Sequence, residues 1–291
     1  MGKPLSITAR SKGQIKGTYP LVRPISAINW LVRNSFDDGT PIFFYHTIKR
    51  GLNFKSYKDL LEVKYKQTGD VTTSRSGETT EVTFETDFIR EYEATFGQTI
   101  GSIGDDNFFI KESKRVLGIS GMDASQYVAI GAGAYSSTVV SLDISTKRLS
   151  VDKFNYNELN TKLENEKPFV NLENSESSKS KTYYINTNEK AFGGKGNYHS
   201  PTQSKSVAQY EAYKKNLNMN TFRINVSGDF NMQPGAIIRL KVISGDESSN
   251  VSINKYMTGK YLVKEVQHSF DEKYTMRLTI CRDSFERSNN N

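Results

Sequence analysis

Three histidines, His46, His199 and His268, are the residues of this sequence best suited to acid–base chemistry near neutral pH. A catalytic histidine needs a serine or cysteine nucleophile and an orienting acid beside it, and none of the three stands in a motif that supplies them. His46 follows the apolar run at residues 42–45 and His268 ends another apolar segment, which favours capping or packing roles, while His199 lies in a polar stretch. We predict no catalytic residue and no enzymatic activity.

Metal-ligating patterns are equally sparse. Cys281 is the single cysteine, which excludes an intramolecular disulfide and a cysteine-based metal cluster and is typical of folding in a reducing cytoplasm. No two histidines have the spacing of ligands on one helix face, and no set of carboxylates has the spacing of a calcium loop. We therefore expect no metal site and no cofactor.

Two glycine-rich segments approach the pattern of a nucleotide-binding loop without completing it. At residues 193–196, Lys195 is followed by Gly196 where a phosphate-binding loop has Ser or Thr. At residues 131–136, Ser136 stands where the dinucleotide fingerprint has its third glycine. We interpret the first segment as a flexible loop and expect no nucleotide site in either.

The positive charge is concentrated near the N-terminus. The chain of 291 residues has a formal net charge of +7, and residues 1–70 hold 12 Lys and Arg against 5 Asp and Glu, so residues 71–291 hold 27 of each sign. Such a segment could face nucleic acid or an acidic protein, or form a solvated surface. No stretch approaches the roughly 20 apolar residues of a membrane helix, so we expect no membrane partner.

A small α/β domain is expected at residues 21–80, after an N-terminal arm at residues 1–20. Pro24 suits a first helical turn, and apolar residues at helical spacing follow it up to Phe36. Residues 42–45 and 52–54 favour strands, and Ser56 followed by Asp59 resembles a capping box that opens a second helix. Residues 67–80 are small and polar, which indicates a loop.

The rest of the chain favours strands. Periodicity predicts the following elements: strands at 81–84, 139–144, 222–226, 236–243, 261–268 and 274–280, and helices at 87–95 and 204–218. The C-terminal strands alone would leave unpaired edges, so earlier strands are needed to complete the sheet. We predict an α+β, mainly β fold with a discontinuous antiparallel barrel made of residues 81–150 and 203–291, and a polar insertion at residues 151–202.

Several phrases of the chain resemble the central baseplate hub protein of T-even-like contractile-tailed bacteriophages. The resemblance covers roughly residues 20–66 and 200–285 and keeps the order of the phrases. They are Ala27 to Leu31, Ile42 to Tyr45, Gly51 to Phe54, Ala208 to Tyr210 with Tyr213, Gly228 to Gly235 with Ile237 and Ile238, Tyr261 to His268, and Tyr274 to Cys281. Each phrase alone is a weak signal, and the specificity comes from their occurrence together and in order, with Gly228-Asp229-Phe230-Asn231, Pro234-Gly235 and Glu265-Val266 at compatible offsets.

The resemblance implies a structural subunit and its partners. It implies a homotrimeric ring of tail-tube-like barrels that joins the tail tube, or a tube-initiator protein, to the central spike, contacts other baseplate subunits and surrounds passing DNA without sequence-specific binding. It implies localisation in the virion baseplate after assembly in the host cytoplasm. The family's first barrel would precede residue 20, where there is too little chain to build it, so we expect it to be truncated, split off or supplied by another chain.

Two functions of other classes stay open. The basic N-terminal quarter fits a nucleic-acid-binding module, for which salt-dependent DNA affinity is the test. A tail-associated hydrolase is less favoured for want of a site, and turnover of a glycan would reveal it.

The last strand provides a test of register. Tyr274, Met276, Leu278 and Ile280 share one face, and the residues between them, with Cys281, share the other. We expect the first face to be core, so Leu278→Asp should bury an unpaired charge and cost several kcal/mol, whereas Thr279→Asp should be much milder. The melting temperatures of the two variants, compared side by side, check the assignment.

Overall fold

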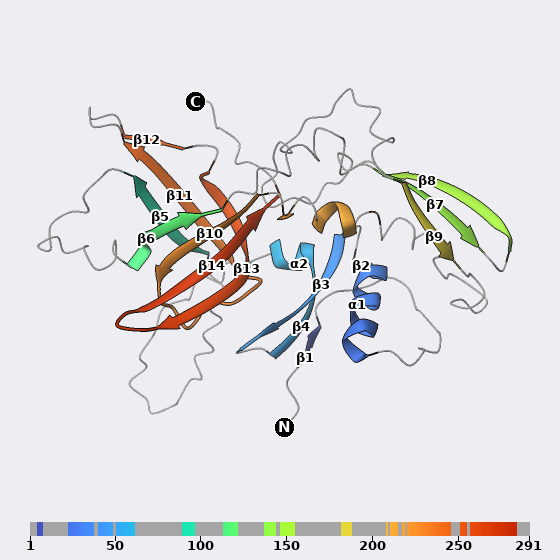
Figure 1. The fold of residues 1–291 in the computed structure, drawn as a ribbon, viewed down its shortest axis with the longest axis horizontal. Coiled ribbons are helices and arrows are strands. Elements are labelled where there is room, and N and C mark those ends of the chain that lie inside the picture. The colour runs from blue at the N-terminus through green and yellow to red at the C-terminus, as the bar shows by residue number, and fades with distance from the viewer. Residues whose placement is uncertain are drawn as a thin grey trace, which may run out of the picture.

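The computed structural model shows three sheets in the part of the chain that it describes (Figure 1). The described residues are 5–7, 23–37, 40–48, 51–61, 89–96, 113–121, 137–143, 146–154, 182–187, 208, 210–214, 217–218, 220–245, 251–254 and 257–283. The predicted strand at 81–84, the loop at 67–80, both glycine-rich segments and His199 lie outside them. The mainly β character expected from the sequence is confirmed.

The first unit is a four-stranded sheet with two helices. Its elements are β1 (Leu5–Ile7), α1 (Pro24–Asn34), β2 (Phe36–Asp37), β3 (Thr40–Thr47), β4 (Gly51–Ser56) and α2 (Tyr57–Leu61), and its strand order is β1-β4-β3-β2. The helix that starts at Pro24 and the strands β3 and β4 agree with the sequence prediction, whereas the two-residue strand β2 was not predicted. The segment interpreted as an arm contributes β1, which pairs in parallel with β4. A parallel partner so distant in sequence leaves no local signal.

The predicted capping box is confirmed. The backbone N–H of Asp59 donates to Ser56 Oγ at 3.1 Å, and the backbone N–H of Ser56 donates to Asp59 Oδ2 at 3.3 Å. This reciprocal pair satisfies two donors that a helix start otherwise leaves open. It fixes the start of α2, whose Tyr57 and Leu60 are buried.

The large sheet curls around its own core. Its strands are β5 (Arg90–Phe96), β6 (Val116–Ser120), β10 (Asn220–Ser227), β11 (Ile237–Gly245), β12 (Val251–Ile253), β13 (Gly259–Phe270) and β14 (Tyr274–Arg282). The order is β12-β11-β13-β14-β10-β6, with β5 also paired to β11. The edge strands β5 and β6 approach each other at one isolated bridge between Glu93 and Arg115. The sheet thus curls far enough for its two ends to meet, as Figure 1 shows on the left.

Two expectations about this sheet are wrong. Residues 87–95 were predicted as a helix, but Arg90–Phe96 is strand β5, and its Tyr92 and Ala94 are buried while the residues between them are polar. That alternation has the period of a strand, and it outweighs the helical propensity of Glu91 and Glu93. The sheet is also not purely antiparallel, because β5 runs parallel to β11.

A third sheet contains the strand predicted at 139–144, which we expected in the barrel. That strand, β7 (Ser137–Asp143), pairs antiparallel with β8 (Arg148–Phe154) and parallel with β9 (Thr182–Thr187). The segment interpreted as a polar insertion therefore supplies β9 and most of β8. Periodicity shows which face of a strand is apolar but not which strand it pairs with. The domain boundaries themselves stay predictions.

Apolar side chains fill the inside of the curled sheet. The buried members are Tyr92, Ala94, Phe222, Ile224, Val226, Met232, Ile238, Leu240, Val242, Tyr261, Val263, Met276, Leu278 and Ile280. Leu278 and Ile280 are 0% exposed, so the face of β14 predicted as core is core, with Tyr274 half-buried at its start. One interior cluster thus joins β5, β10, β11, β13 and β14 with Val116 and Ile119 of β6.

A second cluster lies on the outside of the same sheet. Tyr57 and Leu60 of α2, with Tyr213 and Leu217, pack on Ile237, Leu262 and Cys281. Tyr213 and Leu217 belong to the predicted 204–218 helix, of which 208, 210–214 and 217–218 are described and helical. The expectation that the second face of β14 is open to lumen or solvent is therefore wrong at its C-terminal end, where Thr279 is 8% and Cys281 2% exposed. The first unit and this helical segment cover it.

This burial changes the control for the register test. Leu278→Asp should still lower the free energy of unfolding by several kcal/mol, on the order of 3 or more, because the carboxylate has no partner inside the sheet. Thr279→Asp should also destabilise, because the Thr279 hydroxyl donates to Glu265 Oε2 at 3.2 Å and a carboxylate there would face another. Arg277→Asp, on the exposed face, is the mild control. The assignment is supported if the denaturant midpoint is highest for Arg277→Asp, lower for Thr279→Asp and lowest for Leu278→Asp. Equal midpoints contradict it.

Alkaline pH should weaken the fold. Burial raises the pKa of Cys281 from 9.0 to about 12 and those of Tyr92 and Tyr261 from 10.0 to about 12. Well below pH 9 the folded and the unfolded chain both keep these protons, so the stability of the fold is not reduced by their titration. As pH rises further the unfolded chain releases them first, so stability falls until the native groups titrate near pH 12. Denaturant midpoints from pH 8 upward measure this fall, which should be shallower for Tyr92→Phe, and parallel curves would refute it.

Candidate assembly surface

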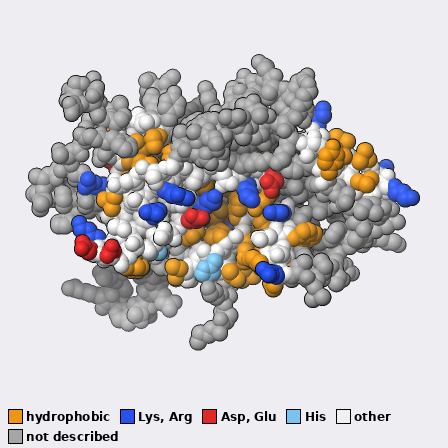
Figure 2. Space-filling model, viewed as in Figure 1, with side chains coloured by type: hydrophobic (Ala, Val, Ile, Leu, Met, Phe, Trp, Pro, Cys, Tyr) orange, Lys and Arg blue, Asp and Glu red, His pale blue; other side chains and the backbone are white. Residues whose placement is uncertain are grey.

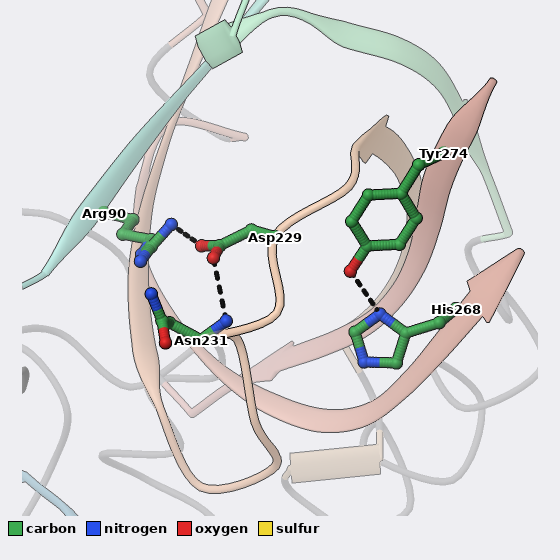
Figure 3. Close-up of polar contacts among 5 residues, drawn as sticks. All are labelled: Arg90, Asp229, Asn231, His268 and Tyr274. Atoms are coloured by element: carbon green, nitrogen blue, oxygen red, sulfur yellow. Dashed lines mark hydrogen bonds and ion pairs between the residues drawn. The ribbon is translucent and has the colours of Figure 1, made fainter. Parts of the chain in front are cut away.

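The loop between β10 and β11 is anchored to β5 by an ion pair. Asp229 accepts from Arg90, the first residue of β5, and from the backbone N–H of Asn231 at 2.8 Å (Figure 3). The N–H of Met232 donates to the Asp229 carbonyl at 3.1 Å, and the Met232 side chain enters the core of the sheet. One carboxylate thus closes the turn and fixes it against a strand from much earlier in the chain.

Four aromatic rings stack beside this loop and form what we call the aromatic tip, made of Phe230, His268, Phe270 and Tyr274. The centroid of the Tyr274 ring lies 4.6 Å from that of the Phe230 ring and 4.7 Å from that of the Phe270 ring. The planes of the Tyr274 and Phe270 rings differ by 4°. The Tyr274 hydroxyl and His268 Nδ1 are 2.9 Å apart, and Figure 3 shows them facing each other from the two strands of the hairpin. Stacking and a hydrogen bond hold the rings in one arrangement.

The outer rings of the tip are open to solvent. Phe230 is 66% and Phe270 65% exposed, and neither belongs to the buried core of the sheet. Exposed aromatic rings held in one arrangement are typical of protein contact surfaces, because they bury area on binding with little loss of side-chain entropy. The tip is therefore a candidate contact surface.

Two positions of the loop require glycine because a neighbouring side chain lies too close to the backbone for a Cβ atom. A Cβ on Gly228 would lie 2.1 Å from the Tyr274 ring, and one on Gly235 would lie 2.5 Å from the Tyr45 hydroxyl of β3. Gly235 also has a φ of +86°, which favours glycine. The loop thus touches the aromatic tip at its start and the first unit at its end.

The histidines considered for chemistry are not brought together. His268 lies in the aromatic tip, and His46 is exposed on β3. Among the residues that the structure describes, no group of three or more His, Cys, Asp or Glu side chains could hold a metal ion. No helix in the described segments is long and apolar enough to span a membrane.

Sequence reasoning did not find the aromatic tip. Phe230 lies far along the chain from the hairpin, whose loop is residues 271–273, shorter than the five residues 269–273 left between the strands predicted at 261–268 and 274–280. The available signal was Phe270 and Tyr274 at the two ends of a hairpin, where exposed aromatic residues are uncommon.

The Gly228 contact gives a direct test. Gly228→Ala should push the Tyr274 ring off the loop and lower stability by roughly 1–3 kcal/mol, a cost typical of overpacking. Gly118→Ala is the matched control, since its Cβ would meet its nearest atom, Asn225 Nδ2, at 3.5 Å. Denaturant unfolding measures the difference, and chemical shifts of the Tyr274 ring report its displacement. Equal stability of the two variants with unchanged shifts would contradict the packing.

No protein-family model matches the sequence, and no curated protein matches it. Among solved structures, the chain is similar to the tail protein from Neisseria meningitidis MC58, with a TM-score of 0.43 and 12% sequence identity. The similarity covers 97% of this chain and 61% of that chain, so the present chain spans less than two thirds of the length of that tail protein.

Proposed function

We propose that this chain is a structural subunit of the baseplate hub of a contractile phage tail and has no catalytic activity. In this role it forms a homotrimeric ring between the tail tube, or its initiator, and the central spike, contacts other baseplate subunits and is found in the virion. The phrases quoted from the sequence support the proposal, because those of the C-terminal part lie on the helical residues 208 and 210–214, the β10–β11 loop and the β13–β14 hairpin. In the proposal, the curled sheet takes the role of the tube-like barrel.

The observation that carries the proposal is the filled interior of that sheet. Leu278, Ile280 and Ile224 are 0% exposed inside it, so a single copy encloses a core rather than a passage. A passage for DNA has to be enclosed by several copies, as a ring does. The rigid, exposed aromatic tip is the kind of surface that such a ring needs for its contacts.

Imaging of the purified chain tests the ring. Negative-stain electron microscopy should show closed three-fold particles with a central opening, and light scattering should give three times the mass of one chain. Particles without an opening, or a monomer at every concentration, would count against the proposal.

The basic N-terminal quarter is the observation that keeps nucleic-acid binding as a second candidate. Fluorescence anisotropy of labelled duplex DNA, titrated with the protein at two salt concentrations, distinguishes a hub subunit from a nucleic-acid-binding module. A hub subunit should bind weakly, whereas a binding module should bind tightly at low salt and lose affinity steeply as salt rises.

A further inference from the structure

The three-stranded sheet β8-β7-β9 exposes an apolar face. Its register places Val140 opposite both Val151 and Tyr184, and Leu142 opposite Leu149. These five residues share one face because every second residue of a strand points the same way. Four of them are strongly exposed: Leu142 by 43%, Leu149 by 65%, Val151 by 58% and Tyr184 by 81%.

The opposite face of this sheet is mixed in character and, on β7, buried. Ser137, Val139, Ser141 and Asp143 of β7 are at most 5% exposed, and the hydroxyls of Ser141 and Ser150 are 2.5 Å apart. A sheet with one solvated face normally buries its apolar residues and exposes its polar ones. Here the exposed side is itself apolar, which points to a protein contact on it, and we call this side the apolar sheet face.

Basic side chains border the apolar sheet face. Lys147 of the β7–β8 turn and Lys153 of β8 are exposed, and the alternation of β8 puts Lys153 on the same side as Leu149 and Val151. Figure 2 shows hydrophobic side chains over these strands at the right of the molecule, with Lys and Arg beside them. The surface therefore fits an apolar partner flanked by carboxylates.

The aromatic tip has that chemistry. The exposed rings of Phe230 and Phe270 adjoin the hairpin loop, where Asp271 and Glu272 are exposed beside Lys273, leaving one net negative charge. Figure 1 shows the hairpin loop at one end of the long axis and β7, β8 and β9 at the other, so one copy cannot join its own two surfaces.

We propose that the aromatic tip of one copy docks on the apolar sheet face of the next copy, head to tail. This inference rests on the proposed ring and names its contact. A contact between two apolar sheet faces would bring the basic residues of both copies together, which like charges disfavour. Two different surfaces at opposite ends give a heterologous contact, and such contacts repeat into a ring when the rotation closes.

Charge exchange tests the contact. One variant carries Asp271→Lys and Glu272→Lys on the tip, and another carries Lys147→Glu and Lys153→Glu on the rim. Sedimentation over a concentration series should show each variant associating about tenfold more weakly than the wild type, the size expected for close like charges. The chain with all four substitutions should regain association, because opposite signs meet again.

Leu149→Asp tests the apolar part against a matched control. It should abolish association, whereas Leu117→Asp, on an exposed leucine of β6, should leave it unchanged. Circular dichroism and melting temperature confirm that each variant folds.

The outcomes separate this contact from the ring itself. Closed rings that persist in both charge variants overturn the head-to-tail contact and leave the ring in place. Charge-dependent association into open chains keeps the contact and overturns the ring. If the chain with all four substitutions stays dissociated, the contact is overturned. If the wild-type chain is monomeric at every concentration, both the contact and the ring are overturned.

Discussion

The hydroxyl of Tyr57 donates a hydrogen bond of 2.7 Å to the carboxylate of Asp283, and both residues are 0% exposed. The two lie 226 residues apart, at the start of α2 and just beyond the end of β14. A buried carboxylate is costly unless donors satisfy it, so this hydrogen bond stabilises the packing of the first unit on the curled sheet. The apolar cluster around Tyr57 and the approach of Tyr45 to Gly235 lie at the same contact between the two.

Arg282, one residue earlier, fixes the same strand end to the sheet. It is 1% exposed, its guanidinium lies 4.9 Å from the centre of the Tyr261 ring, and it donates to the Thr258 carbonyl at 3.1 Å. Burial raises the pKa of the Tyr213 hydroxyl, and the nearby Asp283 raises it further. Two opposite charges at consecutive positions thus hold two layers together: Asp283 holds the outer unit and Arg282 holds the strand end.

Local signals in the sequence predicted the elements but not their partners. Alternation located β10, β11, β13 and β14, and the spacing of Ser56 and Asp59 located the start of α2. The same reasoning put β7 in the wrong sheet and left Cys281 facing lumen or solvent, because a period of two cannot reveal the neighbouring strand or a second covering layer. The sequence did not predict the aromatic tip for a related reason, because Phe230 of the β10–β11 loop and Tyr274 of the hairpin come together only in the folded sheet.

The two exposed surfaces differ in how firmly the fold holds them, and this difference bears on assembly. At the tip, Gly228 admits the Tyr274 ring and Asp229 ties the loop to Arg90, so Phe230 is held in place before any contact forms. Rigid groups lose little entropy on binding, which leaves more of the burial free energy for association. The apolar sheet face is a set of cross-strand pairs, and the opposite side of β7, which carries Val139 and Ser141, is buried, so the apolar side stays outward. In the head-to-tail contact proposed above, the carboxylates beside the tip would lie next to Lys147 and Lys153, so that opposite charges would meet.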